Sequence, residues 1–404
     1  MNSQEIKATF SIGSLYVVRM LGLFMVLPVL PLMADSIAGA TPFLIGLALG
    51  AYGLSQALLQ IPMGIWSDRL GRKTVIIAGL LVFILGSVIA GLSESIYGII
   101  VGRLLQGCGA IASSLLALVG DVTAPNNRTK AMAIVGMSIG ASFGIALVLG
   151  PFLSVKFGLS GLFLITALLG ALGVLVALTF PGETQAPRRD VWDLAGFRQV
   201  LKDANLTRVT LGVFALHYLL MSSFVAFPLL MASTGQIPAE SHHFYYLGLL
   251  VVTFVLMGPL MRMADKPGRA LPIALAMIAA FTIANVVLAL DHHFYGVMLG
   301  MALFFMAFNL LEVVLPAMLS RIAPGSYRGS AMGVYSSAQF AGAFFGGAMG
   351  GLIAGGWQIT YVLWVNALIC IAWFLFTMGL NEPGDAGASS LDETNAVSSQ
   401  QARN

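Results

Sequence analysis

Charged residues are scarce in this chain. Only 9% of its 404 residues are Asp, Glu, Lys or Arg, whereas a soluble domain carries about 25%. So small a charged fraction cannot cover a surface that faces water. It also excludes intrinsic disorder, which requires low hydrophobicity and high charge. The 58% of hydrophobic residues and the mean hydropathy of +0.91 indicate a chain that lies in a lipid bilayer.

Several functional motifs are missing as well. The two cysteines, Cys108 and Cys370, both fall in apolar runs, where a thiol behaves as a small hydrophobe rather than as half of a disulfide. There is no Gly-x4-Gly-Lys-Ser/Thr phosphate loop and no His-Glu-x2-His zinc motif. We therefore expect no enzyme activity, no cofactor and no metal site. The histidine pairs at 242–243 and 292–293 are interpreted as loop residues.

Apolar runs are abundant, and each is close to the ~20 residues that a membrane-spanning helix needs. Strands of a membrane barrel would instead alternate over about ten residues. The predicted spans are 10–33, 44–66, 74–92, 97–119, 130–152, 160–180, 207–231, 243–263, 270–290, 294–320, 329–352 and 358–380. The sequence thus predicts an all-α membrane protein with twelve transmembrane helices in two six-helix bundles.

Cations indicate the orientation, because Lys and Arg stay on the cytoplasmic side of a polytopic protein. With the N-terminus inside, 17 of the 20 cations fall in cytoplasmic segments, Lys156 falls outside, and Arg19 and Arg103 fall within spans. We therefore expect both termini in the cytoplasm. Topology accounts for the basic residues, so we expect no binding of nucleic acid.

A polar stretch, 181–206, divides the apolar chain into six plus six spans. We predict an N-terminal bundle over 1–180, a cytoplasmic linker over 181–206, a C-terminal bundle over 207–380 and a disordered cytoplasmic tail over 381–404. Within the linker, apolar residues at helical spacing opposite Arg and Lys predict a helix along the inner membrane surface. A simple tether between the bundles explains this segment equally well.

The two halves repeat each other in sequence. Four residues near the end of the second span recur 197 positions later: Pro62, Asp68, Gly71 and Arg72 return as Pro259, Asp265, Gly268 and Arg269. Weak internal repeats of six spans are typical of secondary transporters, in which the substrate binds between the halves near the middle of the membrane.

The first copy of this loop has a spacing of its own, formed by Gly64, Asp68, Arg69, Gly71 and Arg72. A glycine near a helix end permits the close approach of another helix, and an aspartate can face the positive N-terminus of a neighbouring helix. An ordinary positive-inside loop explains the cations. It does not explain the Gly-x3-Asp-x2-Gly spacing or its repetition in the second half.

With this loop the chain resembles the major facilitator superfamily, whose signature motif lies between spans 2 and 3. The resemblance covers about residues 8–382. It extends to the superfamily's fourth-helix motif, at Arg103-Leu-Leu-Gln106-Gly107, and to the first-helix motif of twelve-span drug:proton antiporters, at Leu21-Gly22 and Pro28-Val29-Leu30-Pro31. A glycine-rich packing motif of antiporters is similar to Gly140, Gly144, Gly150 and Pro151. Small residues usually follow that motif, where this chain has Phe152 and Leu153.

The resemblance implies a transporter of the bacterial inner membrane that works by alternating access. We expect a monomeric proton-coupled antiporter that exports a small amphipathic compound or drug, with that compound, protons and the lipid bilayer as its partners. A uniporter or a proton symporter for import is the alternative transport mode, and a membrane sensor or enzyme is the alternative from another class. The chain ends soon after its last span, so we expect no regulation by a soluble C-terminal domain.

The resemblance also assigns a switching role to the loop. Asp68 and Arg72 would latch the halves together in the outward-open state, with Asp68 facing the start of span 11. Asp121, at the inner end of span 4, would complete a charge relay with Arg72. The second copy, Asp265 and Arg269, would act in the same way against span 5.

Glu312 is, by these limits, the only acidic residue buried within a span. A charged side chain at a helix centre costs about 2.5–3.5 kcal/mol on insertion scales, so it persists mainly where it faces a water-filled cavity or exchanges a proton. We interpret Glu312 as the residue that carries or gates the proton. A structural alternative is a hydrogen bond to Asn309, one turn earlier.

Other residues within the spans complete the candidate site. Arg103, supported by its motif, would assist proton transfer, and His217 could pair with Glu312 because histidine titrates near neutral pH. The substrate cavity is predicted to include Arg19, Gln106, Tyr218, Phe308 and Asn309. The structural alternatives are arginines satisfied by the backbone and a packed polar histidine.

Overall fold

The computed structural model describes residues 1–180, 194–264, 266, 268–324 and 328–380. Its elements in chain order are α1 (Ser3–Phe24), η1 (Leu30–Ser36), α2 (Pro42–Leu70), α3 (Arg72–Leu92), α4 (Ile96–Cys108), α5 (Ala112–Val122), η2 (Pro125–Asn127), α6 (Arg128–Leu178), α7 (Leu194–Lys202), α8 (Ala204–Ser233), η3 (Ala239–Ser241), α9 (His242–Ala264), α10 (Ala270–Leu290), α11 (Phe294–Ile322), α12 (Arg328–Gly356) and α13 (Thr360–Met378). The described residues form no strand beyond one isolated bridge, so the predicted all-α class is confirmed. The predicted tail at 381–404 and the linker residues 181–193 lie outside the described residues.

Within these ranges, eleven helical segments are long and apolar enough to cross a membrane. One of them, α6, has 51 residues, far more than the ~20 of a single crossing. The helix breaks at Gly158, whose φ of 64° lies in the left-handed region that glycine adopts without strain. The segment therefore supplies two crossings, the predicted spans 5 and 6, and the chain reaches the predicted twelve.

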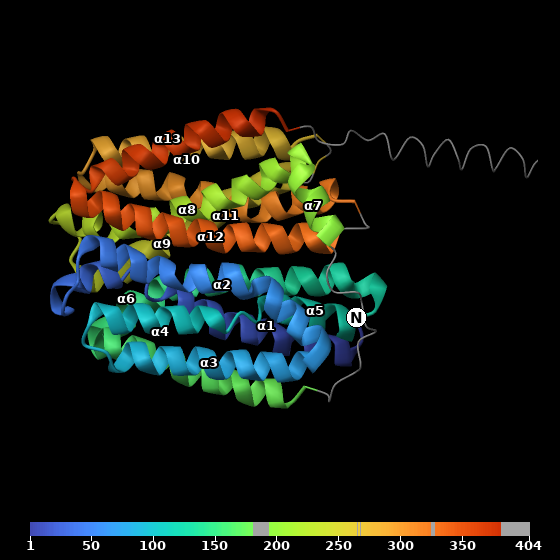
Figure 1. Cartoon of the computed structure of the whole chain (residues 1–404). Helices are drawn as coiled ribbons and strands as arrows, with labels where there is room; N and C mark the ends of the chain where they lie inside the picture. The colour runs from blue at the N-terminus through green and yellow to red at the C-terminus, as the bar shows by residue number, and fades with distance from the viewer. Residues whose placement is uncertain (181–193, 265, 267, 325–327, 381–404) are drawn as a thin grey trace, which may run out of the picture.

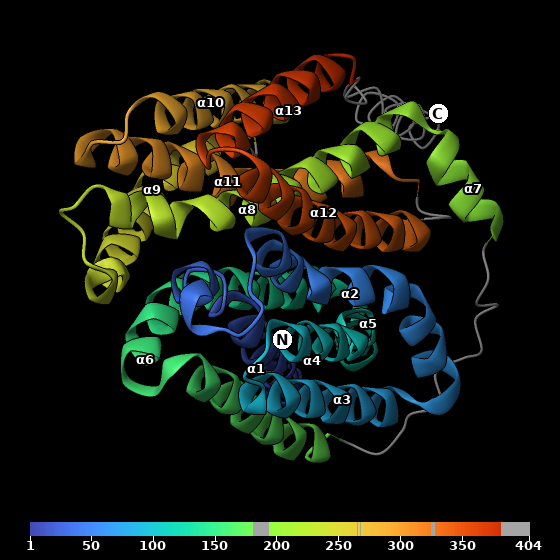
Figure 2. The same cartoon turned by 60° about the vertical axis from the view of Figure 1, so that its left-hand side comes forward.

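The helices gather into two groups, α1–α6 and α8–α13, with α2 against α12 where the groups meet (Figure 1). Figure 2 shows the same boundary after rotation. The N-terminus and α7 lie at one end of the molecule, which we call the inner end after the predicted topology. The opposite end, where α2 begins at Pro42, is called the outer end.

Only residues 194–206 of the predicted linker are described; Leu194–Lys202 form the helix α7, and α8 already begins at Ala204. Val200 is buried where α7 packs against α8 and α12, whereas Leu201 is 66% exposed. An exposed leucine beside a charged face is the pattern of a helix that lies along a membrane surface. The interfacial position of this helix stays a prediction.

Two predicted spans are broken helices. Span 1 ends as α1 at Phe24 and leads through a turn into η1, because Pro28 and Pro31 lack the N–H donors that a helix requires. Span 4 is divided into α4 and α5 at Gly109, where a Cβ atom would lie 2.3 Å from the Gly79 carbonyl oxygen of α3. Span 4 therefore breaks at a point of close backbone contact with α3.

Helix α1 begins earlier than predicted, at Ser3, because Asn2 and Glu5 form a capping box. The Glu5 carboxylate also accepts hydrogen bonds from the backbone N–H of Ala124 at 2.7 Å and from Nδ2 of Asn127 at 3.0 Å. Glu5 is consequently buried. The predicted limits of span 1 had left this acid in a tail, and it ties the start of α1 to the segment before α6.

At the outer end, α2 and α12 are in backbone contact. A Cβ atom at Gly46 would lie 2.2 Å from the carbonyl oxygen of Gly347, and a Cβ atom at Gly50 would lie 2.6 Å from that of Phe344. Only glycine permits two helices to approach so closely. The two halves are therefore closed against each other on this side, along a surface that we call the outer seam.

At the inner end the same helices are apart. Gly333 lies about four turns before Gly347 on α12, and a Cβ atom at Gly333 would meet nothing within 4 Å. On α6, a Cβ atom at Gly144 would touch Leu250 of α9 at 3.7 Å, but one at Gly140, a turn closer to the inner end, would touch nothing. From the closed outer seam, these open positions and the predicted topology we infer an inward-open arrangement.

Candidate functional site

Three polar side chains from three helices of the second half meet around Glu312. The amide nitrogen Nε2 of Gln339, on α12, donates to Glu312 Oε1, on α11, at 3.2 Å and to His217 Nε2, on α8, at 2.8 Å. His217 Nε2 also lies 3.6 Å from Glu312 Oε2, an oxygen with no hydrogen-bond partner among the described residues. Gln339 thus bridges the histidine and the carboxylate.

The contacts of His217 define its tautomer. Its Nδ1 atom lies 3.2 Å from the carbonyl oxygen of Val213. A carbonyl oxygen only accepts hydrogen bonds, so Nδ1 carries the proton and Nε2 is the acceptor of the neutral ring. A proton that arrives at Glu312 therefore has an acceptor nitrogen within reach.

The cluster lies on the face of α11 that looks toward the first half. Phe308 lies one turn before Glu312, and its ring centre is 5.4 Å from that of Phe143 on α6 and 5.9 Å from that of His217. Residues four apart share a face of a helix, so Glu312 faces the first half too. Its side chain is 32% exposed, on the inner side of the aromatic contact.

Two other predicted cavity residues lie nearby. Asn309 is buried, and its Nδ2 atom has no partner within the described part of the chain. The observed partner of Glu312 is Gln339, and no hydrogen bond between Asn309 and Glu312 occurs among the described residues. Tyr218 is buried, and its backbone approaches Gly346 of α12, where a Cβ atom would lie 2.2 Å from the Tyr218 carbonyl oxygen.

Arg103 is fully buried and satisfied within the first half. Its guanidinium donates to the carbonyl oxygens of Ala48 and Leu49 on α2, both at 3.3 Å, and to Gln106 Oε1 at 3.1 Å. Gln106 in turn donates to Ser87 Oγ of α3 at 2.8 Å. Arg103 and Gln106 therefore connect α4 to α2 and α3, and neither contacts the Glu312 cluster.

Arg19 is also fully buried, but its hydrogen bonds are incomplete. Its Nη2 atom donates to Gln56 Oε1 on α2. The Nε2 atom of Gln56 donates in turn to Gln60 Oε1 at 2.7 Å. The other two nitrogens of Arg19 have no hydrogen-bond partner among the described residues. The guanidinium carbon lies 5.7 Å from the ring centre of Tyr52.

The loop after α2 carries the charged residues of the predicted relay. Arg72 forms ion pairs with Asp68, one turn earlier, and with Asp121 at 3.1 Å, and it donates to Ser67 Oγ at 2.7 Å. Gly71 makes the turn with a φ of 96°, and Arg69 is exposed.

The next residue, Lys73, ties this loop to the end of α6. Its Nζ atom donates to the carbonyl oxygens of Leu178 at 2.8 Å and Phe180 at 2.9 Å. A cation at the C-terminus of a helix satisfies carbonyls that lack a partner and favours the helix dipole.

The described contacts of this loop all lie within the first half. A Cβ atom at Gly329 would meet nothing within 4 Å, and Gly64 approaches only Ser113 of α5, in its own half, at 3.3 Å. Asp68 is paired inside the first half. A latch between Asp68 and α12 requires the other conformation, and it stays a prediction.

Replacing Asp68 by Asn tests this latch. We expect transport to fall several-fold without loss of ligand binding, since an exposed ion pair contributes about 0.2–1 kcal/mol and the change weakens the closed inner end. Transport rate and ligand affinity are measured on the same purified protein. Asp35→Asn, a change of an exposed acid at the outer end, is the matched control. Normal turnover in Asp68→Asn would exclude the latch.

The second copy of the loop is only partly visible. Asp265 lies outside the described residues, and Arg269 is exposed at the start of α10. The glycines of the predicted packing motif on α6 have separate surroundings. A Cβ atom at Gly150 would lie 2.3 Å from the Met25 carbonyl oxygen, and Pro151 follows inside the helix. Gly144 faces α9, and Gly140 faces open space.

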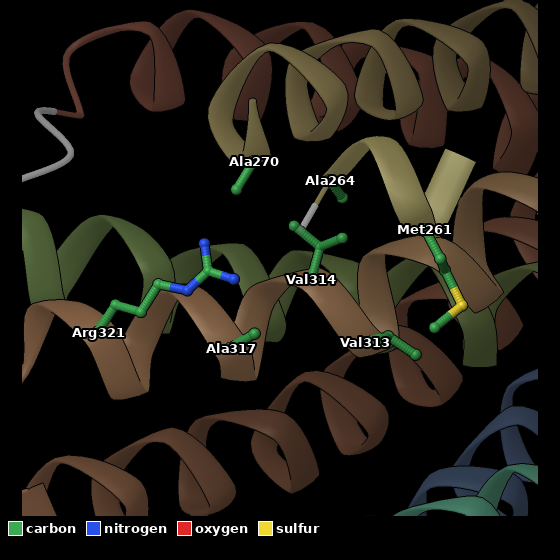
Figure 3. A pocket seen from close by; sticks show the side chains of 7 residues that line it. All are labelled: Met261, Ala264, Ala270, Val313, Val314, Ala317 and Arg321. Carbon is green, nitrogen blue, oxygen red and sulfur yellow. The ribbon is translucent and has the colours of Figure 1, made fainter. Parts of the chain in front are cut away.

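A crevice opens on the other face of α11, between α9, α10 and α11 (Figure 3). Its walls are apolar apart from one guanidinium, which points into it. The lining residues are Met261, Ala264, Ala270, Val313, Val314, Ala317 and Arg321. None of them belongs to the Glu312 cluster, so the crevice is separate from the candidate site.

Comparison with known proteins decides the family. A family model described as Major Facilitator Superfamily matches residues 12–308 and 209–402. The chain belongs to the major facilitator superfamily. It is 42% identical to the inner membrane transport protein YajR of Escherichia coli (strain K12) over 387 residues, which are 95% of this chain and 85% of that relative.

More distant members agree with this assignment. Multidrug resistance protein 2 of Bacillus subtilis (strain 168) is 27% identical over 355 residues, which cover 83% of this chain and 86% of the relative. The crystal structure of the nucleoside transporter NupG has the same fold, with a TM-score of 0.69 and 15% identity over 94% of this chain and 99% of that one. This member of the major facilitator superfamily is a multi-pass membrane transporter of a small molecule and not an enzyme.

Sequence reasoning missed Gln339, the centre of the cluster in this major facilitator protein. A glutamine within a predicted span, about two turns after Ala331-Met332 of the repeated motif, was an available signal. Gln56 and Gln60, which share α2 with Tyr52, were missed too, because an uncharged polar residue stands out less in an apolar span than a charged one does.

Proposed function

We propose that this transporter is a proton-coupled antiporter of the bacterial inner membrane that exports a small amphipathic compound by alternating access, with both termini in the cytoplasm. The observation that carries the proposal is the cluster of Glu312, Gln339 and His217 on the face toward the first half. A carboxylate persists inside a membrane mainly where it exchanges a proton or faces water. The similarity to Multidrug resistance protein 2 supports export of drug-like compounds.

The geometry suggests how proton and conformation are coupled. In the inward-open arrangement the Glu312 side chain is partly exposed. When the inner end closes, an ionised carboxylate loses its hydration, whereas the neutral acid does not carry this cost. Protonated Glu312 can donate to His217 Nε2 in place of the Gln339 amide, and closure of the empty transporter is thereby favoured. A substrate that displaces Gln339 from this bridge competes with the proton, as antiport requires.

Arg103 has a supporting role in this proposal. Its bonds to the backbone of α2 hold Ala48 and Leu49 beside the outer seam. We infer that Arg103 assists coupling by positioning α2 rather than by direct contact with Glu312.

Transport into proteoliposomes with an imposed pH gradient tests the coupling. A screen of resistance and accumulation in a transporter-deficient bacterium first identifies a transported compound. Purified protein in vesicles with an acidic lumen should then accumulate that compound as protons leave, and the rate should fall to the passive level when the gradient is abolished. Flux that ignores the gradient would show a uniporter, and flux that follows the protons would show a symporter.

A further inference from the structure

The first half contains two buried cations that share one aromatic neighbour. Arg19 on α1 and Arg103 on α4 are both 0% exposed. Their guanidinium carbons lie 5.7 Å and 5.4 Å from the ring centre of Tyr52 on α2. Across the described ranges, no Asp or Glu oxygen lies within 4.0 Å of either guanidinium. A buried cation without a counterion is costly unless other groups compensate it.

The two arginines differ in how far they are compensated. Arg103 donates to two carbonyl oxygens and to Gln106. Arg19 donates only to Gln56, and its Nε and Nη1 atoms have no partner in the described part of the chain. The hydroxyl of Tyr52 is likewise buried without a partner there. Two guanidinium nitrogens and one hydroxyl are therefore without partners, and the guanidinium carbon lies 5.7 Å from the centre of the ring that bears this hydroxyl.

We propose that Arg19 and Tyr52 bind a singly charged anionic group. A guanidinium with free N–H groups, a hydroxyl donor and no neighbouring acid favour an anion over a cation or a neutral group. The ligand is either the anionic group of the exported compound or a free inorganic anion. If the ligand is the anionic group of the exported compound, the inference rests on the proposed export function, and the substrate is then an amphipathic anion.

The place of Tyr52 in the fold indicates when the site opens. Its ring centre is 6.4 Å from that of Phe340 on α12, across the boundary between the halves. Gly53, the next residue, would place a Cβ atom 2.6 Å from the Phe340 carbonyl oxygen, so both residues belong to the outer seam. When α2 and α12 separate at the outer end, Phe340 no longer packs against Tyr52. The Tyr52 hydroxyl and the free N–H groups of Arg19 then become accessible in the outward-open state.

Calorimetric titration of the purified full chain with benzenesulfonate tests the proposal. This probe stays charged at neutral pH, and benzenesulfonamide is its uncharged isostere. We expect benzenesulfonate to bind and benzenesulfonamide not to bind. Arg19→Met should weaken binding by roughly 10- to 100-fold, as expected for loss of hydrogen bonds to a charged group. Arg208→Met, which removes a cation stacked on Phe376 at 5.6 Å, is the matched control and should bind as the parent does.

A sodium chloride titration distinguishes the two sources. If chloride competes with benzenesulfonate in the parent chain and not in Arg19→Met, the site takes a free inorganic anion; if chloride has no effect, the site takes an organic anionic group. Should Arg19→Met fail to fold, Tyr52→Phe retains the fold and should weaken binding by about 2- to 10-fold through the lost hydroxyl donor. Equal binding of the two probes, or full binding by the folded variants, would overturn the proposal. The titration uses no gradient, so its outcome is independent of the test of proton coupling.

Discussion

Glu312→Gln should abolish gradient-driven exchange while the protein still folds and inserts. One pH unit is worth about 1.4 kcal/mol per proton, so an antiporter that exchanges one proton accumulates its substrate roughly tenfold for each unit. Glutamine keeps the shape of the side chain and its contact with Gln339, but it cannot take up a proton. Accumulation in proteoliposomes should therefore drop to the level without a gradient.

Glu94→Gln is the matched control for this variant. Glu94 is an exposed acid at the outer end, so its loss should leave accumulation unchanged. Exchange between equal concentrations of substrate on both sides separates coupling from binding. Glu312→Gln should retain this exchange at any fixed pH, because it needs no proton. Accumulation that still follows the gradient in Glu312→Gln would remove this residue from the mechanism.

Gly46→Val should stop transport by holding the protein away from the inward-open state. Any Cβ atom at this position would lie 2.2 Å from the backbone of Gly347, and a backbone cannot move aside as a side chain can. Overpacking costs about 1–3 kcal/mol, which shifts an equilibrium between two states by roughly 5- to 150-fold. The penalty applies only while the outer seam is closed, so the outward-open population should rise.

Thiol labelling at the inner end measures this shift. Met137 on α6 is 66% exposed, about two turns from Gly144 on the face toward α9. Every protein in this experiment carries Cys108→Ser and Met137→Cys. A maleimide should label the introduced cysteine quickly when position 46 is glycine and slowly when Gly46→Val is added. Gly248→Val is the matched control, since Gly248 is an exposed glycine with nothing within 4 Å of a Cβ atom. Equal labelling rates in all three proteins would show that the seam does not control the state.

Parts of the site were predictable from the sequence because charged residues are scarce in this chain. Few charges occur in the spans, so Glu312, Arg19 and Arg103 could be found by position alone. The ion pair of Arg72 with Asp121 followed from the resemblance of the loop, whereas the pair of Arg72 with Asp68 was not predicted. The proximity of His217 to Glu312 was predicted, but the place of Gln339 between them was not. Contacts of α12 with α8 and α11 depend on helix rotation and spacing, which hydropathy does not encode.

The helix boundaries, too, were predictable only where they do not depend on contacts between helices. Twelve apolar runs could be recognised by length, yet the break of span 4 at Gly109, beside Gly79 of another helix, could not. The early start of α1 depends on Glu5, which is buried only because Ala124 and Asn127 lie beside it. Local propensity thus predicts that a helix exists, and tertiary contact decides where it begins, breaks and meets its neighbours.

The hydrogen bonds of Lys73 have a mechanical consequence. They fasten the start of α3 to the carbonyl oxygens of Leu178 and Phe180, the point at which the chain leaves the first half. A displacement of Phe180 is therefore received by α3, one residue from Arg72, as well as by α6. The exit of the chain from the first half and the ion pairs of Arg72 share a single corner of the molecule, so such a displacement acts directly on the loop.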